Sequence, residues 1–214
     1  MIDLNWLYKT LFINLGPSGW WPADSKREII LGAILVQNTN WSNADKALQN
    51  LKAKTHLDPQ KILSFSQAKL MKIIRSSGFY KNKSKAILAT FQWFNKRNWK
   101  YKQIWKTNKK CLRTQILSLP GIGQETADTF LLYIFNQPVF IADSYTRRLF
   151  QHLGYQNTNS YTQLKKQVKL PNNFSYLKAQ DFHGLIDNFG KKYLRNNLQF
   201  THSFLATKLD HKFQ

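Results

Sequence analysis

The sequence predicts an all-helical fold: helical patterns recur along the chain, short loops separate them, and no run of alternating apolar and polar residues indicates a strand. The chain has 214 residues, of which 43% are hydrophobic and 14% aromatic, with only 9 Gly and 6 Pro. This composition is typical of a chain that folds, despite its high charge. The length suits one large domain or two small lobes.

The predicted helices begin at capping residues and end at turn-forming residues. Ser25 and Glu28 have the spacing of a capping box before an apolar helical face. A second helix begins at residue 39 or 40, and a third begins at Ser66 and ends at Gly78. Further helical patterns cover residues 83–94, 109–117, 124–135, 144–153, 162–168 and 176–193.

The charge of the chain indicates a polyanionic partner. Lys and Arg total 32 against 11 Asp and Glu, which gives a formal net charge of +21. Acidic residues are absent between Asp58 and Glu125, while basic residues and aromatics alternate there, so this stretch is a folded basic lobe rather than a tail. For any single lysine, the alternative is an ordinary solvated helix surface. For the chain as a whole, nucleic acid is the favoured partner.

The single cysteine, Cys111, excludes an internal disulfide framework, a multi-cysteine zinc site and a four-cysteine iron–sulfur cluster. A reducing cytoplasm, with the protein associated with the nucleoid, and a monomeric state are expected. The amino terminus lacks the features of a signal peptide, and no apolar stretch approaches the ~18 residues that span a membrane. The histidines show no metal-ligand spacing, and no catalytic role is assigned to them: His56, His152, His183, His202 and His211.

A tight turn and an aspartate are the two local motifs that indicate chemistry. Pro120, Gly121 and Gly123 form a turn between two helical patterns, and its amides point outward at a helix N-terminus, where a phosphate can bind. The alternative is a plain helix–helix connection. Further on, Asp143 follows an apolar triplet and opens a helix; taken alone, it is most simply an N-cap.

Together the hairpin and Asp143 resemble the helix-hairpin-helix DNA glycosylase superfamily. Three further stretches match, residues 35–39, 78–86 and 182–190, so the resemblance covers nearly the whole chain. It implies two helical lobes with a cleft between them. Residues 24–136 would form a six-helix lobe with the hairpin motif at about 109–135. Residues 1–23 and 137–214 would form the second lobe. Many relatives hold a four-cysteine iron–sulfur cluster near the carboxyl end, but this chain has only Cys111, so we expect no cluster in the region of residues 193–214.

The resemblance also implies a reaction. Bifunctional relatives carry a Schiff-base lysine two residues after the second hairpin glycine, where this chain has Glu125. We therefore expect a monofunctional glycosylase of base excision repair, without lyase activity, in which the Asp143 carboxylate stabilises the oxocarbenium charge and orients or deprotonates water. An alkylated purine leaves as a neutral base without a general acid, so the apparent absence of a second acid favours alkylated substrates, chiefly 3-methyladenine.

The predicted base pocket resembles that of the bacterial 3-methyladenine DNA glycosylases of the endonuclease III branch. It comprises Trp20, Trp21, Pro22 and Trp41. A cationic methylpurine over an indole face gains about 0.5 to 2 kcal/mol by cation–π attraction, which discriminates against neutral bases. The alternative is that Trp20 and Trp21 only fill the seam between the lobes.

The predicted DNA contacts complete this interpretation. Flipping a nucleotide leaves a gap in the stack, which Phe79 would fill from one side and Gln37 from the other; the alternative for Phe79 is ordinary core. Lys83, rather than Lys85, is assigned to phosphate. The remaining contacts are backbone groups of the hairpin, namely Gly121, Ile122, Gly123, Gln124 and Thr126, and a Na⁺ or K⁺ ion held by the carbonyls of Leu119 and Ile122.

Two rival functions share these features. One keeps the fold but changes the substrate to mismatched, deaminated or oxidised bases. The other is a non-catalytic protein that binds damaged DNA, which accounts for the charge but leaves Asp143 without a purpose in a basic environment.

Overall fold

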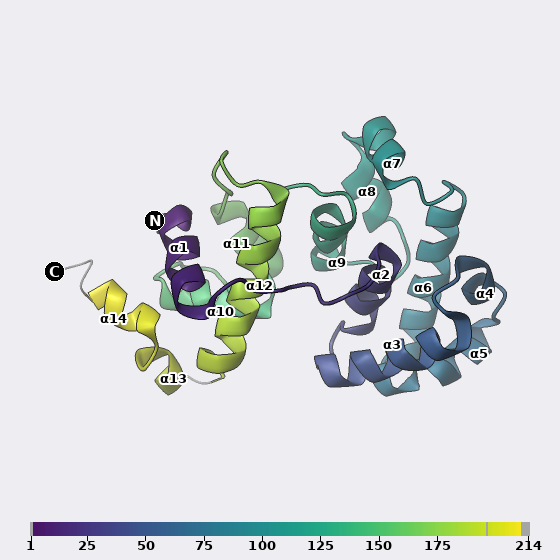
Figure 1. Ribbon diagram of the computed structural model, residues 1–214, viewed down its shortest axis with the longest axis horizontal. Helices are drawn as coiled ribbons and strands as arrows, with labels where there is room; N and C mark the ends of the chain where they lie inside the picture. Colours follow the sequence, from purple (N-terminus) through teal and green to yellow (C-terminus); the bar gives the residue numbers. More distant parts are fainter. Residues whose placement is uncertain (1, 196, 211–214) are drawn as a thin grey trace. The chain divides into compact units, whose positions relative to one another are not determined.

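The computed structural model describes residues 2–195 and 197–210, and within these ranges it contains helices and loops but no strand (Figure 1). The predicted all-helical class is confirmed. The chain divides into two compact units. The central unit is Ala23–Phe135, and the terminal unit combines Met1–Pro22 with Asn136–Gln214. Each boundary lies one residue before the expected one.

Eight α-helices form the central unit, all of it within the described residues, where six were expected. The additional ones are the short helices α4 and α7. The helices are α2 Lys26–Leu35, α3 Trp41–Thr55, α4 Pro59–Leu63, α5 Gln67–Ile73, α6 Tyr80–Asn95, α7 Tyr101–Asn108, α8 Leu112–Leu117 and α9 Gln124–Thr129. A 3₁₀ turn, Arg75–Ser77, precedes α6, and a π-helical turn, Phe130–Ile134, continues α9.

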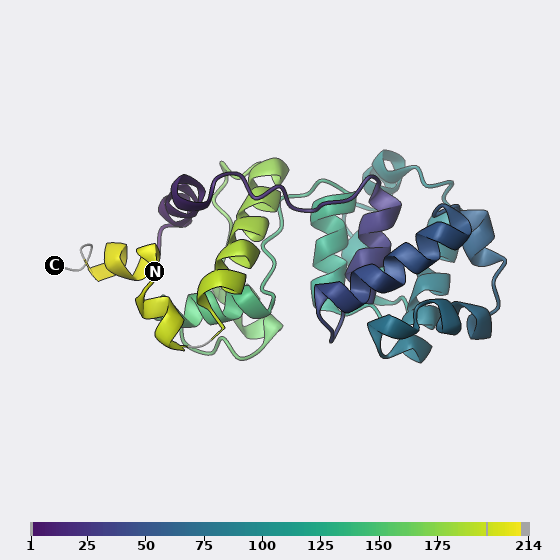
Figure 2. The ribbon, with the colours of Figure 1, turned by 60° about the horizontal axis from the view of Figure 1, so that its bottom comes forward.

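Helix α2 is the centre of the central unit, because it packs against α3, α6, α9 and the π-helical turn (Figure 2). Its apolar residues Ile30, Leu31 and Ile34 are fully buried. Aromatic rings of α6 and the π-helical turn complete the core, and Phe94 lies 6.4 Å from Phe130, centroid to centroid. A buried α2 explains why its sequence is apolar on nearly every side rather than on one stripe.

The helix starts predicted at Ser25 and Ser66 are confirmed. The Ser25 hydroxyl accepts the Glu28 N–H, and the Ser66 hydroxyl accepts the Lys69 N–H. Each bond satisfies one of the amides that a helix N-terminus leaves without an internal partner. The predicted helix end at Gly78 is corrected: α5 ends at Ile73, and Gly78, with a φ of +64°, caps the 3₁₀ turn that follows.

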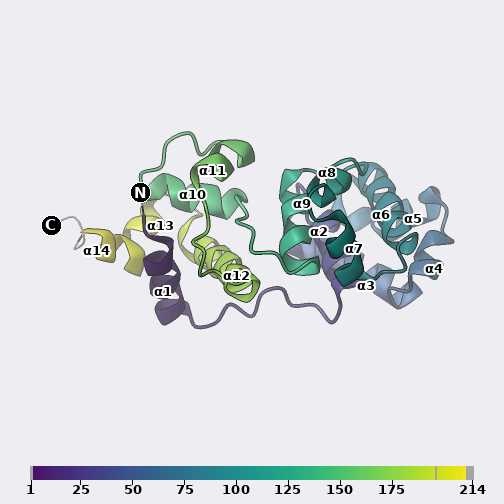
Figure 3. The same ribbon diagram turned by 90° about the horizontal axis from the view of Figure 1, so that it is seen from above.

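Helix α12 organises the terminal unit by contacting α1, α10 and α13 (Figure 3). The helices of this unit are α1 Leu4–Leu15, α10 Ser144–His152, α11 Tyr161–Gln167, α12 Tyr176–Tyr193, α13 Asn197–Thr201 and α14 Phe204–Asp210. Helices α13 and α14 lie in the region where many relatives are expected to hold an iron–sulfur cluster. Aromatic packing holds this region, with Phe204 5.5 Å from Phe189 and Phe200 stacked 4.1 Å from His152, centroid to centroid.

Across residues 2–195 and 197–210, every helix is too short or too polar to cross a membrane. The same residues contain no group of three or more His, Cys, Asp or Glu side chains that could hold a metal ion.

Lys83 corrects the sequence prediction, because it is a structural residue and not a phosphate ligand. Its side chain is buried, and its ammonium donates to the carbonyl oxygens of Leu35 at 2.8 Å and Ser77 at 2.6 Å. The lysine therefore ties the start of α6 to the end of α2. Burial lowers the pKa of Lys83 to about 8, so the amine is still largely charged at neutral pH. Lys85, two positions on, is the exposed one.

We predict that Lys83→Met lowers the free energy of unfolding by about 1 to 3 kcal/mol, because two carbonyls lose a charged donor. Lys85→Met is the matched control and should change stability by less than about 0.5 kcal/mol. Urea denaturation of the three proteins measures both effects. Equal stability of the two variants would contradict the tie between α2 and α6.

Candidate active site and nucleic-acid interface

Asp143 is the N-cap of α10, and its two carboxylate oxygens have different partners. The apolar triplet before it is buried, which fixes where α10 begins. Oδ1 accepts the backbone N–H of Thr146 at 2.8 Å, as the simpler interpretation of the sequence expected. Oδ2 lies 3.4 Å from Nε2 of His183 on α12. The side chain is 16% exposed, so the carboxylate sits in a largely enclosed place but can be reached.

The surroundings of Asp143 keep it ionised. Burial acts to raise its pKa, but the hydrogen bond and charge of His183 and the hydrogen bonds from Thr146 outweigh burial, so the pKa of Asp143 is lowered. The sequence prediction missed this partner and gave His183 no role. The available signal was its place in the matched stretch 182–190 near the carboxyl end.

A stripe of polar side chains extends from His183 along one face of α12. His183, Asp187 and Lys191 are spaced four residues apart, which places them on the same side of a helix. Asp187 and Lys191 form an ion pair. The pKa of Asp187 is raised: burial is the largest cause, the Asp143 carboxylate adds to it, and Lys191 and His183 oppose it. A second carboxyl group therefore neighbours Asp143, which corrects the premise that a second acid is absent.

The segment that carries the two tryptophans is anchored to α12. Asp181 accepts the N–H of Ser18 at 2.8 Å and the hydroxyl of Tyr8 at 3.0 Å. Gly184 lets the segment approach closely, since a Cβ there would lie 2.4 Å from Cβ of Trp20. The contact places Trp20 beside Gly184, the residue after His183.

Trp20 and Trp21 lie against each other, with ring centroids 5.1 Å apart and planes at 44°. The ammonium of Lys191 lies 4.7 Å from the centroid of the Trp20 ring. Both indoles are half-buried and Pro22 is exposed. The structure thus brings Trp20 and Trp21 to the polar stripe of α12 within the terminal unit. Trp41, the fourth predicted pocket residue, is the first residue of α3 in the central unit.

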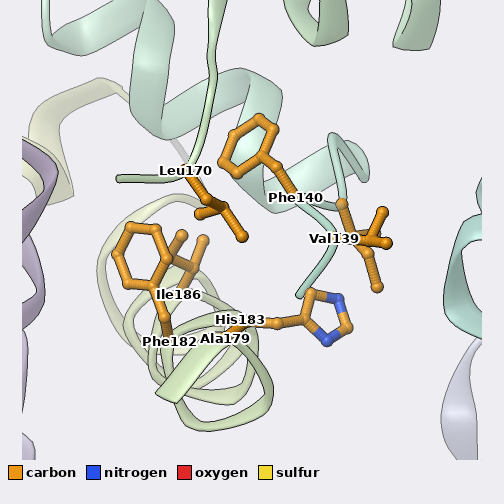
Figure 4. A pocket seen from close by; sticks show the side chains of 8 residues that line it. Val139, Phe140, Leu170, Ala179, Phe182, His183 and Ile186 are labelled. Atoms are coloured by element: carbon orange, nitrogen blue, oxygen red, sulfur yellow. The ribbon is translucent and has the colours of Figure 1, made fainter. Parts of the chain in front are cut away.

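Neither of two hollows in the part of the chain that the structure describes includes a predicted pocket residue. The hollow beside His183 measures about 10 Å³ and is too small for a nucleobase (Figure 4). Figure 4 shows His183 extending from α12 toward Val139, away from Phe182 and Ile186. A hollow of about 300 Å³ lies in the central unit where α6 ends and α7 begins, and its lining includes Lys96, Arg97 and Lys100.

The hairpin between α8 and α9 requires glycine at its tip. Gly121 has a φ of +74°, and a Cβ there would lie 2.9 Å from Cβ of Ala86 on α6. The Ile122 N–H donates to the Leu119 carbonyl at 3.2 Å. Gly121, Gly123 and Gln124 are exposed, whereas the Ile122 side chain is buried. Any DNA contact at Ile122 is therefore made by its backbone.

An ion pair within the central unit braces the hairpin. Arg113 of α8 donates to both carboxylate oxygens of Asp128 on α9, at 2.8 and 3.2 Å. The carboxylate is 1% exposed. A bidentate guanidinium–carboxylate pair of this kind fixes orientation as well as distance, so α8 and α9 hold a defined angle about the turn.

Gln37 and Thr126 are engaged with each other at the hairpin. The side-chain amide of Gln37 donates to the Gly121 carbonyl at 3.2 Å and to the Thr126 hydroxyl at 2.9 Å. The Thr126 side chain is buried and its hydroxyl accepts from Gln37, so the DNA contact predicted for the Thr126 backbone stays a prediction. For Gln37, entry into a DNA stack stays a prediction and requires these two bonds to open.

Phe79 is exposed at the N-terminus of α6, and the alternative that it is ordinary core is wrong. Its side chain is 63% exposed, and its backbone has a φ of +45°. The carbonyl of Phe79 accepts the N–H groups of Asn82 and Lys83, which fixes the backbone that carries the ring. An apolar ring held in water at a rigid helix end is the geometry of a wedge.

Glu125 lies exposed in the first turn of α9. Its carboxylate favours a helix N-terminus electrostatically. It supplies no amine at the position where the resemblance places a Schiff-base lysine.

Comparisons with known proteins agree with this geometry. Residues 31–172 match the model of the HhH-GPD superfamily of base excision DNA repair proteins. A candidate DNA repair glycosylase of Methanocaldococcus jannaschii is 37% identical over an alignment of 194 residues that covers 88% of this chain and 87% of that protein.

Solved structures show the same fold. The H. pylori 3-methyladenine DNA glycosylase bound to 1,N6-ethenoadenine superposes with a TM-score of 0.70 at 26% identity, covering 91% of this chain and all of that one. An endonuclease III in a non-covalent complex with DNA gives a TM-score of 0.72 at 17% identity, over 92% and 90% of the two chains. The chain therefore belongs to the HhH-GPD superfamily of base excision DNA repair proteins.

Proposed function

We propose that this base excision glycosylase is monofunctional and hydrolyses the N-glycosidic bond of flipped-out alkylated purines in duplex DNA, chiefly 3-methyladenine. The observation that carries the proposal is the Asp143 carboxylate, held ionised by His183 and Thr146 in the unit that also holds the paired tryptophans. The protein acts as a monomer in the cytoplasm, on the nucleoid.

Asp143 supplies the electrostatic part of the reaction. As the bond between C1′ and the base breaks, positive charge develops on the sugar, and a fixed carboxylate stabilises that charge more strongly in an enclosed site than in water. Oδ1 accepts the Thr146 N–H at 2.8 Å, whereas the contact of Oδ2 with Nε2 of His183 is longer, at 3.4 Å, so in this proposal Oδ2 is the oxygen that turns to the sugar or an attacking water. Water then adds to C1′ and loses its proton to the carboxylate.

The paired indoles support an alkylated substrate. An alkylated purine carries a formal positive charge, and an indole face attracts it by about 0.5 to 2 kcal/mol beyond stacking. Lys191 already places a cation over Trp20, which illustrates that this face accepts positive charge. The similar H. pylori enzyme is named for 3-methyladenine, which is consistent with the proposal.

DNA is held by the central unit in this proposal. The exposed backbone of Gly121, Gly123 and Gln124 faces phosphate, and a Na⁺ or K⁺ ion at the carbonyls of Leu119 and Ile122 would bridge to it. Phe79 enters the stack. The net charge of +21 makes affinity fall steeply with salt, by roughly 0.9 in log K per log unit of salt for each neutralised phosphate.

We predict that Asp143→Asn lowers release of methylated purines from alkylated duplex DNA by about 100-fold or more, because the neutral amide cannot stabilise the sugar cation. Asn is also a good N-cap, so α10 is preserved. Asp3→Asn, at the N-cap of α1, is the matched control and should keep full activity. Equal release by wild type and Asp143→Asn would remove Asp143 from the mechanism, and no release by wild type would favour the non-catalytic DNA-binding protein.

We predict that Phe79→Ala lowers kcat/KM on lesion-containing duplex by roughly tenfold, because an unfilled gap in the stack removes part of the few kcal/mol that flipping needs. The control is Phe12→Ala, which removes an exposed ring from the terminal unit, whereas Phe79 lies in the central unit. Single-turnover excision on defined duplexes measures the effect. If both variants retain wild-type rates, Phe79 is not the wedge.

We predict that borohydride traps no covalent complex between this protein and lesion-containing DNA, because Glu125 occupies the position of the amine nucleophile. An endonuclease III, for which a trapped covalent DNA intermediate is known, is the positive control. A trapped complex with the wild-type protein would show that another lysine acts as nucleophile and that the enzyme is bifunctional.

A further inference from the structure

We propose that Asp187 is a general acid of the same reaction, which donates a proton to the departing base and extends the substrates from cationic alkylated purines to neutral damaged purines. The inference rests on the glycosylase function proposed above and names a second substrate class for its site. A neutral purine is a poor leaving group, and protonation at a ring nitrogen makes it comparable to an alkylated one.

The packing of α10 against α12 brings the two carboxyl groups together. His183 contacts Asp143, and Asp187 follows His183 by one helical turn on the same face. At the next turn, Gly190 lies against the ring of Tyr145, since a Cβ at this glycine would come within 2.4 Å of the ring. Helix α10 therefore approaches α12 closely on both sides of Asp187.

Lys191 connects Asp187 to the proposed base pocket. Its ammonium forms an ion pair with Asp187 and also lies 4.7 Å from the centroid of the Trp20 ring. The space between that carboxyl group and that indole therefore already accommodates a positively charged nitrogen. A purine that stacks on this face of Trp20 takes the place of the ammonium, and its ring nitrogens then face Asp187.

Burial and the charged neighbours push the pKa values of the two carboxyl groups in opposite directions. The pKa of Asp187 is raised by burial and by Asp143 on α10, against the opposing effects of Lys191 and His183 on its own helix. The pKa of Asp143 is lowered. A pair of carboxyls whose pKa values are pushed apart is the arrangement in which one serves as an acid and the other as a carboxylate. Displacement of the Lys191 ammonium by a base removes the largest opposing effect and raises the pKa of Asp187 further.

The Asp187 O–H bond breaks and its proton joins a ring nitrogen of the purine, while the electron pair of the C1′–N9 bond leaves with the base. The base departs neutral, and Asp187 becomes a carboxylate that pairs with Lys191. The sugar cation faces Asp143 until water adds to C1′ and loses its proton to that carboxylate. Asp143 then returns this proton to solvent, and Asp187 takes up a proton from solvent to restore its carboxyl group.

The test compares one neutral and one cationic lesion in otherwise identical duplexes, 1,N6-ethenoadenine and 7-methylguanine. For Asp187→Asn we expect excision of ethenoadenine to fall by about 100-fold, the usual size of a lost general acid, and excision of 7-methylguanine to change by less than threefold. Asp187→Glu should recover much of the ethenoadenine activity. Asp45→Asn, on α3 of the central unit, is the control.

The pH dependence of the wild-type enzyme provides a test that needs no variant at Asp187. Ethenoadenine excision should decline as pH rises through the pKa of Asp187, while 7-methylguanine excision should not. Lys191→Met should move that decline to higher pH, because removing the ammonium raises the pKa of Asp187.

The outcomes separate this inference from the proposed function. If Asp187→Asn lowers excision of both lesions equally, or the two pH profiles coincide, Asp187 is not the acid. If the wild type excises methylated purines but no neutral purine lesion, the inference fails and the proposed function stands. If the wild type excises no lesion, both the inference about Asp187 and the proposed function fail.

Discussion

The approach of α10 to α12 is the constraint on which the terminal unit's chemistry depends. It places the carboxylate of Asp143 against His183 and the ring of Tyr145 against Gly190, while Gly184 lets Trp20 contact the same helix. Two side chains of ordinary size at Gly184 and Gly190 would separate these elements. Close packing of the backbone thus positions the Asp143 carboxylate, His183 and Trp20, and flexible side chains do not.

Much of the fold could be predicted because most helices have strong local signals. Caps at Ser25 and Ser66 and the apolar content of α2 are local properties of the chain. Helix α7 was missed because Ile104 is its single buried residue, so its apolar pattern is too sparse. Helix α4 has only five residues, although Asp58 and Pro59 form a usable start signal.

The site could be predicted in part. The sequence singles out Asp143, Phe79 and the hairpin glycines because each lies at a helix end, where capping and turn residues form recognisable patterns. The sequence could not show that Lys83 is the buried lysine and Lys85 the exposed one. Lys83 is buried against the carbonyl of Leu35, which lies 48 residues away in the chain. The sequence analysis gives His183 no role and does not single out Asp187 for the same reason: their contacts with Asp143 arise from the packing of α10 against α12.

The contact between Gly121 and Ala86 has a consequence for how damage is found. Because the hairpin rests directly on the helix that begins with Phe79, and Gln37 is bonded to the same turn, these elements form an inflexible template. If this unit binds duplex DNA as proposed, a rigid template obliges the double helix to deform. Lesions that soften the local stack would then reduce the energy of that deformation, so mechanical weakness of the duplex would contribute to recognition before any chemical feature of the base is read.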